Sequence, residues 1–418
     1  MPARVETLPA GLAGSHPSNK RPAHKPGALA AARAARPAVL HLAPALMPDD
    51  PGRETVDLAI LAQRAGWRAI IASNGGLLVP EAERTGVRHA RLPLDRNGLL
   101  VNWRNRVPLE ALIQKERPAL IHAHGPVPAL HALGPCRAHH LPLLADFTQP
   151  LPDRPFTHRL MKKLGALRAV LRVPSDFMAR HLADSFHVEP DSLYVVPPGL
   201  DLKAHDSNAI SLERLAALGK LWRLPEQAAV ILMPMPLAEQ SGHRPFLEAL
   251  AALKREDVFA VLIGNDRAAP GLRGEIESLI ERLGLAGKVI MPEHCLDWPA
   301  AGWLASLVVA PNAAPRGQAL ELLSAQALGR AVIVSNAGAN PEMVLAGETA
   351  LIVPPGDVKA LTEALRRALA LNQRQRLDLV FRARDFVTSA FPQENWAAAM
   401  LQIYEALRAP AKRAVKAA

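Results

Sequence analysis

Cysteine and aromatic residues are scarce in this sequence. Its 418 residues include two cysteines, Cys136 and Cys295, and aromatic side chains make up 4% of the chain. Two cysteines this far apart provide neither a disulfide framework nor a cysteine-ligated metal site. Hydrophobic residues nevertheless reach 49%, with many Ala, Leu and Val, which is typical of a helix-rich α/β protein. The length allows two domains with substantial cores.

Long hydrophobic segments are also missing. No run of about 18 apolar residues occurs, so we expect no transmembrane helix. Residues 1–36 lack the apolar core of a signal peptide, and we therefore expect a cytoplasmic protein.

Acidic residues are outnumbered, and the net charge is +10. The excess lies at the two ends, because residues 1–37 carry +5 and residues 408–418 carry +4, which leaves the body near +1. A basic nucleic-acid groove in the body is therefore not supported, and we expect no nucleic-acid partner. The basic ends either contact an anionic membrane peripherally, at about 1 kcal/mol per basic residue, or are disordered solubilising segments.

The stretch from residue 307 to 357 alternates apolar strand patterns with helical ones. An apolar run over 307–310 is followed by turn residues, by helical spacing over 319–328 and by a second apolar run over 331–334. Such alternation predicts parallel strands, with ligands bound at the loops beyond their carboxyl ends. The loops 311–317 and 335–341 each lead towards a predicted helix N-terminus, which suits an anionic ligand.

The same stretch resembles the donor-site segment of glycosyltransferase family 4. The residues that match the family pattern are Pro311, Gly317, Ala325, Ala327, Gly329, Val332, Ile333, Gly338, Glu342, Pro354, Pro355, Gly356 and Asp357. The segments His122-Ala123-His124, Val173 to Phe177 and Pro197 to Asp201 resemble the acceptor side of the same family. The resemblance covers about residues 38–408.

The resemblance implies the α/β GT-B fold, with two Rossmann-like domains whose parallel sheets face a cleft. The predicted organisation is a disordered basic tail over 1–37, an acceptor domain over 38–200, a linker over 201–225, a donor domain over 226–393, a final helix over 394–408 that packs back on the first domain, and a basic tail over 409–418. It also implies a nucleotide-diphosphate sugar as donor, with no cofactor and no metal ion.

Four charged positions of the family pattern are replaced. Arg316 and Ser324 stand where the family has two glutamates, and Pro236 and Ser241 stand where it has an Arg and a Lys. Losing both cations costs several kcal/mol of transition-state stabilisation. His243 and Arg244 directly follow Gly242 and are candidates for a displaced cation. Glu321 either replaces the second glutamate or is a solvated charge on a helix face.

The segment of Gly338, Ala339 and Glu342 resembles a family segment with two adjacent glycines and a glutamate. It is either a diphosphate-binding loop or an ordinary strand-to-helix turn, with Glu342 interacting with the dipole of its own helix. Together with Gly242, Arg244, Arg316, Gly317 and Ser324, these residues form the predicted donor-binding set.

His124 matches a family histidine near the acceptor side and is the predicted catalytic residue. The alternative is a structural, hydrogen-bonded histidine at the end of a strand. We expect His122 and His124 to point to opposite faces of their strand, so that they share no metal ion. Asp146 is interpreted as a structural acid, and Thr148 stands where the family has a second histidine.

Two functional hypotheses follow. The first is a glycosyltransferase that moves a sugar from a nucleotide-diphosphate sugar to a glycan or lipid acceptor of the cell envelope, such as lipopolysaccharide, with retained anomeric configuration as the resemblance implies. The second is a catalytically silent protein of the same fold that binds a glycan or a protein partner, because four charged positions of one site have changed.

Overall fold

The computed structural model describes residues 36–48, 50–96, 98–267 and 269–409. The basic tails predicted at 1–37 and 409–418 lie outside these residues, apart from residues 36, 37 and 409. The predicted domain limits are not tested and stay predictions. Along the part that is described, no helix is both long and apolar enough to cross a membrane.

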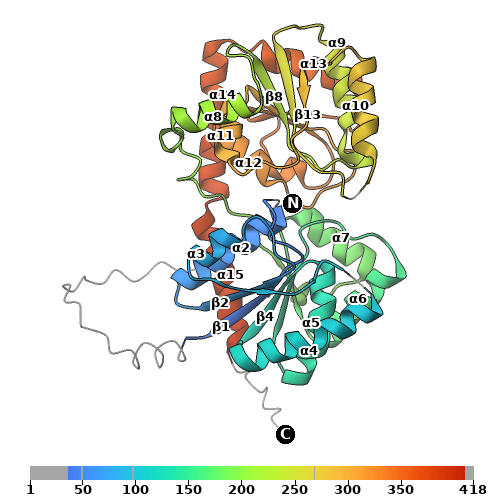
Figure 1. Cartoon of the computed structure of the whole chain (residues 1–418), viewed down its shortest axis with the longest axis vertical. Coiled ribbons are helices and arrows are strands. Elements are labelled where there is room, and N and C mark those ends of the chain that lie inside the picture. Colours follow the sequence, from blue (N-terminus) through green and yellow to red (C-terminus); the bar gives the residue numbers. More distant parts are fainter. Residues whose placement is uncertain (1–35, 49, 97, 268, 410–418) are drawn as a thin grey trace, which may run out of the picture. The chain divides into compact units, whose positions relative to one another are not determined.

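The first sheet has seven parallel strands in the order β3-β2-β1-β4-β5-β6-β7 (Figure 1). Its strands are β1 (Ala38–Leu42), β2 (Arg68–Ser73), β3 (Arg88–Arg91), β4 (Leu120–His124), β5 (Leu143–Asp146), β6 (Val170–Val173) and β7 (Leu193–Val195). Its helices are α2 (Asp50–Arg64), α3 (Val79–Arg84), α4 (Leu99–Glu116), α5 (Pro126–His139), α6 (Pro155–Ala166) and α7 (Asp176–Phe186).

The second sheet has six parallel strands in the order β10-β9-β8-β11-β12-β13. Its strands are β8 (Ala229–Met233), β9 (Val258–Leu262), β10 (Val289–Ile290), β11 (Leu307–Ala310), β12 (Ala331–Ser335) and β13 (Ala350–Val353). The helices that follow β7 are α8 (Leu212–Leu221), α9 (His243–Ala252), α10 (Leu272–Arg282), α11 (Trp298–Leu304), α12 (Leu320–Ala327), α13 (Val358–Leu369), α14 (Gln373–Ala390) and α15 (Gln393–Arg408). Both sheets have the doubly wound Rossmann order, which confirms the predicted fold class.

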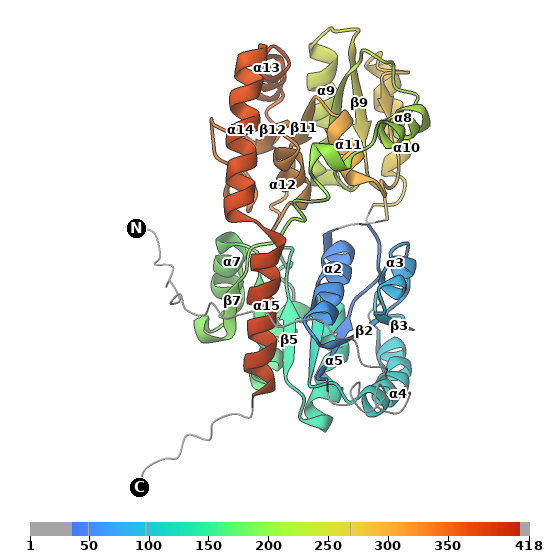
Figure 2. The ribbon, with the colours of Figure 1, turned by 90° about the vertical axis from the view of Figure 1, so that its left-hand side faces the viewer.

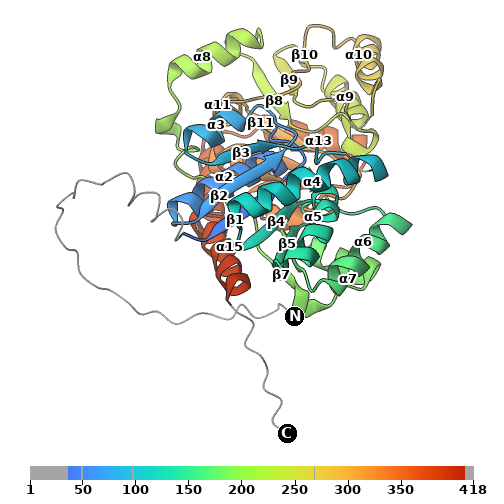
Figure 3. The same cartoon turned by 60° about the horizontal axis from the view of Figure 1, so that its bottom comes forward.

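The first sheet is buried on both faces, as parallel strands flanked by crossover helices must be. Leu40 and Leu42 belong to a core shared with α4, α5 and α6, which Figure 3 shows beside the strands. Val39, one residue out of phase, belongs to the opposite core with α2 and α15. Helix α15 thus packs on the first sheet although it follows the second one in sequence, and Figure 2 shows it beside β5 and α2.

Three local predictions differ from the structure. Helix α5 was not predicted, because Pro126, Pro128 and Pro135 obscure its pattern; the first two lie in its first turn, where proline is tolerated. The sequence pattern predicts a helix over residues 54–65, but α2 begins four residues earlier, at Asp50, with Pro51 in its first turn. The helix start predicted at Pro341 is only a short 3-10 turn, Asn340–Met343. The second predicted anion-binding helix end is therefore wrong.

The chain crosses itself closely where α15 begins. Leu200 N donates to Phe391 O at 2.9 Å, and Gln393 N donates to Leu200 O at 3.1 Å. A Cβ atom on the adjacent Gly199 would lie 2.7 Å from Gln393 Cα and 2.7 Å from Trp396 Cβ. Only glycine fits this crossing without movement of the helix.

We expect Gly199→Ala to lower the free energy of unfolding by about 1–3 kcal/mol, because the added methyl group overpacks the crossing. The matched control is Gly134→Ala within α5, where a Cβ atom meets nothing within 4 Å. There the better helix propensity of alanine should raise stability by about 0.5–1 kcal/mol. Urea unfolding of both variants measures the difference, and equal effects would contradict the close packing of α15.

Candidate functional site

Three loops beyond the carboxyl ends of β8, β11 and β12 pack tightly on one another. Gly242, with φ of 87°, lies so close to the Pro311 carbonyl that any Cβ would overlap it. Gly338, with φ of 62°, lies equally close to the backbone of Arg316, whose carbonyl accepts a hydrogen bond from Ala339 N at 2.8 Å. Both positions need glycine for conformation and for space. The structure therefore brings these four members of the predicted donor-binding set, Gly242, Arg316, Gly338 and Ala339, into one group of loops.

Arg316 is the cation at the centre of these loops. Its guanidinium forms an ion pair with the Glu321 carboxylate in the first turn of α12, and its Nη1 lies 3.3 Å from Met235 Sδ. Glu321 is 7% exposed, so the interpretation of this residue as a solvated helix-face charge is wrong. Glu321 neutralises much of the positive charge that Arg316 introduces.

The two cations proposed from sequence, His243 and Arg244, lie at the start of α9, directly after Gly242. Arg244 forms an ion pair with Glu275 of α10 at 2.5 Å. His243 is buried at the start of α9, and burial lowers the pKa of its imidazole to about 4. It is therefore neutral near pH 7 and does not replace a lysine.

Ser324 lies in the middle of α12, where its side chain is buried. Its Oγ makes no hydrogen bond within the part of the chain that the structure describes. A buried hydroxyl without a partner is uncommon, because its desolvation is not compensated. The structure places this predicted donor-binding residue one to two turns along the helix from the loops.

Gly317 and Glu342 both contact the start of α7. Ser175 Oγ donates to Gly317 O at 2.7 Å. The Glu342 carboxylate accepts hydrogen bonds from Asp176 N at 2.9 Å and from Phe177 N at 2.7 Å. A carboxylate at a helix N-terminus is favourable, because the first N–H groups lack helical partners. The prediction that Glu342 interacts with the dipole of its own helix is wrong, since its partner is α7.

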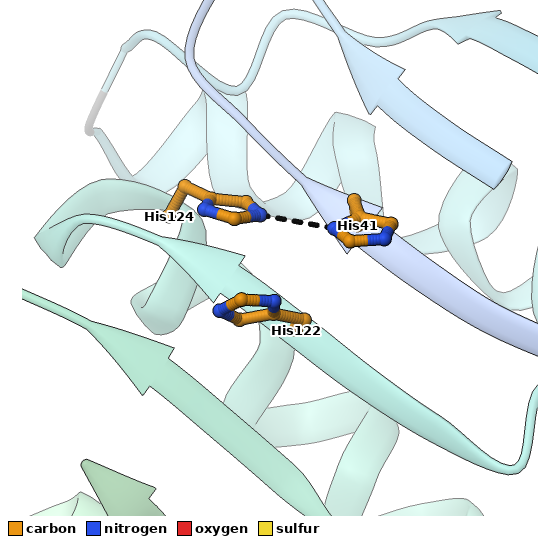
Figure 4. Close-up of side chains that lie close together, drawn as sticks. All are labelled: His41, His122 and His124. Carbon is orange, nitrogen blue, oxygen red and sulfur yellow. Dashed lines mark hydrogen bonds between the residues drawn. The ribbon is translucent and has the colours of Figure 1, made fainter. Parts of the chain in front are cut away.

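A second group of polar side chains lies inside the first sheet. Strand register places His41 of β1 beside His122 of β4, His124 beside Asp146 of β5, and Asp146 beside Arg172 of β6. The expectation that His122 and His124 point to opposite faces is wrong, because side chains two residues apart share one face of a strand. Their ring centroids lie 4.0 Å apart, and His41 Nδ1 lies 3.1 Å from His124 Nε2 (Figure 4).

Asp146 is the centre of this buried group. Its carboxylate lies 3.0 Å from His122 Nε2, 3.6 Å from His124 Nδ1 and 3.6 Å from Arg172 Nη1. Burial alone would raise the pKa of the Asp146 carboxyl, but the two imidazoles and the guanidinium outweigh it and hold this pKa below its usual range.

Two further residues extend the group. Tyr404 Oη of α15 lies 2.8 Å from His122 Nδ1. Glu54 of α2 accepts from Arg172 Nη1 at 2.6 Å and from Gln318 Nε2 at 3.1 Å. The Gln318 bond joins the group to the loop after β11, where Arg316 and Gly317 lie.

His124 is therefore a member of a network, not an isolated strand-end residue. Burial and the neighbouring His122 lower the pKa of its imidazole to about 4, and His41 has a pKa well below the usual value, with burial again the main cause. His124 is neutral near pH 7 and 6% exposed. Its catalytic role stays a prediction.

Sequence reasoning missed His41, Arg172, Tyr404 and Glu54. The signal for the first two was available in principle, because the Rossmann strand order pairs β1 with β4 and β5 with β6. Tyr404 and Glu54 reach the group from helices, and strand register does not predict their positions.

Comparison with known proteins identifies two matching family models. Residues 52–204 match the model described as Glycosyltransferase Family 4, and residues 228–371 match the model described as Glycosyl transferases group 1. The two matches contain the first and second sheets in large part.

Relatives of known activity match at moderate identity. An MMP alpha-(1->4)-mannosyltransferase of Mycolicibacterium hassiacum is 30% identical over 59% of this chain and 56% of that protein. A D-inositol 3-phosphate glycosyltransferase of Xylanimonas cellulosilytica is 28% identical over 54% of each. The chain thus spans little more than half the length of these curated relatives.

Solved structures match over nearly their whole length. A glycosyltransferase from Rickettsia africae superposes with a TM-score of 0.78 at 20% identity, over 89% of this chain and 99% of that one. Anabaena Alr3699/HepE in complex with UDP-glucose gives a TM-score of 0.76 at 16% identity, over 88% and 99%. At these identities the likeness shows the fold, which is GT-B.

The buried His243 predicts a pH dependence of stability. Its imidazole has a folded-state pKa of about 4 and an unfolded value of about 6.5. As the pH falls through this window, the unfolded chain binds a proton that the folded chain does not, so stability falls by up to about 1.4 kcal/mol per pH unit.

We expect His243→Gln to remove this contribution, reducing the pH slope of the unfolding free energy by about one proton. Ser241→Ala is the control, since it alters a buried neighbour that does not titrate in this range. Urea unfolding across a pH series measures both slopes. An unchanged slope in His243→Gln would refute the assignment.

Proposed function

We propose that this chain, a family-4-like member of the glycosyltransferases, transfers a sugar from a nucleotide-diphosphate sugar to a glycan or lipid acceptor of the cell envelope. The transfer proceeds with retention of anomeric configuration and without a metal ion at the diphosphate. The same proposal places the protein at the inner face of an anionic membrane, which its basic tails would contact.

The observation that carries this proposal is the packing of the loops after β8, β11 and β12. Gly242 and Gly338 allow these loops to approach to backbone contact beside the Arg316 side chain. Helix α12 begins at Leu320 without a side-chain cap, and a helix N-terminus of this kind can donate N–H groups to phosphate oxygens. A helix end and a guanidinium together can stabilise a diphosphate leaving group without a metal ion.

The relatives guide the choice of donor. The Anabaena structures hold UDP or UDP-glucose, and two of the relatives are named for transfer to a phosphorylated inositol or for transfer of mannose. These names support a test that begins with UDP-sugars and with nucleotide sugars that carry mannose. They also support a sugar or sugar-like alcohol as the acceptor group.

A second candidate function is a catalytically silent protein of the same fold that binds a glycan or a partner. The pairing of Arg316 with Glu321 and of Arg244 with Glu275 favours it, because both cations near the loops already have acidic partners. The two functions differ in turnover rather than in fold.

Calorimetry with UDP-, GDP- and ADP-sugars and the free nucleotides tests the proposal. We expect at least one nucleotide sugar to bind with a dissociation constant below about 100 μM, which corresponds to more than about 5 kcal/mol. The double variant Arg316→Gln with Glu321→Gln should weaken this binding at least tenfold, since a charge-assisted hydrogen bond contributes about 1.5–3 kcal/mol.

The control pair Arg255→Gln with Asp257→Asn removes an ion pair directly before β9, away from the carboxyl ends of the strands, and should change binding less than twofold. Release of the nucleoside diphosphate in the presence of candidate acceptors then measures turnover. Binding no tighter than millimolar across the panel would exclude the transferase. Tight binding without release of product would instead support the silent protein.

A further inference from the structure

We propose that His41, His122 and His124 bind one divalent transition-metal ion of the zinc class inside the first sheet. The site would be structural, because it lies on β1 and β4 and not on the loops predicted to bind the donor. It does not depend on the binding of a nucleotide sugar, and it gives His124 a metal-binding role in place of the predicted catalytic one. It differs from the expectation, implied by the family resemblance, that the chain holds no metal ion.

The spacing of the three imidazoles carries the proposal. One nitrogen from each ring can be chosen so that all three lie within 4.8 Å of one another. His41 Nδ1 and His124 Nε2 are 3.1 Å apart. Two imidazole nitrogens on a tetrahedral zinc ion, each about 2.0–2.1 Å from the metal, lie roughly 3.3 Å apart. The three rings lie together on β1 and β4 (Figure 4), and nitrogens up to 4.8 Å apart must come closer to share one ion.

The surroundings of the rings match those of metal sites. Ligating histidines usually direct their second nitrogen to a carboxylate, which fixes the orientation of the ring. Asp146 occupies this place, with its carboxylate 3.0 Å from His122 Nε2 and 3.6 Å from His124 Nδ1. His41 departs from this pattern, because its Nε2 is buried and has no hydrogen-bond partner among the described residues. Tyr404 Oη, 2.8 Å from His122 Nδ1, is close enough to complete or support the ligand set.

The buried charges of this group favour an added cation. Asp146 and Glu54 are both buried and face a single buried guanidinium, that of Arg172. Two buried carboxylates beside one guanidinium favour an added cation, because an uncompensated charge is costly in a protein interior. A divalent ion bound by the three imidazoles would supply this positive charge. Imidazole nitrogens favour Zn²⁺, Cu²⁺, Ni²⁺ and Fe²⁺ over Mg²⁺ or Ca²⁺.

A bound ion would tie together segments far apart in the sequence. His41 and His122 come from neighbouring strands, and Tyr404 comes from the last helix. The ion would therefore link β1 to β4 directly and hold α15 against the sheet through Tyr404. Removal of the ion should therefore weaken the packing of α15 on the first sheet before other parts of the fold are affected.

Elemental analysis of the full chain tests the proposal. The protein is produced without a polyhistidine tag, purified without chelator, and separately refolded from denaturant with Zn²⁺ present, so that a buried site is filled during folding. We expect about one metal ion per chain in at least one preparation, and at least a fivefold lower content in His41→Gln and in His122→Gln. His158→Gln is the matched control, because His158 is an exposed histidine paired with Asp153; its metal content should not change.

Replacing Zn²⁺ with Co²⁺ during refolding gives an independent readout, since tetrahedral imidazole ligation produces visible ligand-field absorption. The band should be lost in His41→Gln and His122→Gln, whose circular dichroism shows whether they still fold. A metal content far below one per chain in both preparations would overturn the proposal. Equal metal content in the wild type and the folded variants would overturn it as well.

Discussion

The burial of Asp146 is the constraint on which the first sheet depends. A carboxylate taken out of water must be matched by hydrogen bonds and opposite charge, or its desolvation destabilises the fold. Here the match comes from neighbouring strands, His122 and His124 on one side and Arg172 on the other. Arg172 in turn binds Glu54 of α2, so the same requirement orders a helix as well as the strands. The face of the sheet under α2 and α15 is therefore polar at its carboxyl end and apolar elsewhere.

In the second sheet the paired charges lie in the loops that follow the strands and not within the strands. Its strand-end loops keep the glycines that permit backbone contact, while the cation Arg316 is held by Glu321. A guanidinium already in an ion pair can still donate to a phosphate, because it has five N–H groups and a carboxylate uses only some of them. The ion pair thus fixes the orientation of the Arg316 side chain, and the Glu321 carboxylate reduces the net positive charge at the loops. Arg316 stands where the family resemblance places the first glutamate, so the charge at this position is reversed. A carboxylate is still present nearby, because Glu321 forms an ion pair with Arg316.

Sequence patterns predicted the fold well because its elements are strongly encoded. The apolar runs that form β11 and β12 and the helical spacing between them predicted parallel strands, and the family resemblance implied two Rossmann-like domains. The order of the strands in each sheet was not predicted. Helix α5 was missed, since its prolines weaken the local pattern that defines a helix. The buried polar group was missed for another reason. Its members are up to 363 residues apart, His41 and Tyr404, and only strand register and helix packing bring them together. Assigning His122 and His124 to opposite faces concealed the one local signal that existed.

The two sites meet in the bond between Gln318 and Glu54. Gln318 belongs to the same loop as Arg316 and Gly317, and Glu54 belongs to the ionic group around Asp146. A hydrogen bond between a buried amide and a buried carboxylate is strong, and leaving either partner unpaired costs free energy. The position of the loop after β11 therefore depends on Glu54, whose carboxylate accepts hydrogen bonds from Arg172 of the first sheet and from Gln318 of the loop. Removal of this carboxylate would leave a buried amide and a buried guanidinium each without one partner, so the first sheet and the loop after β11 share one requirement for burial.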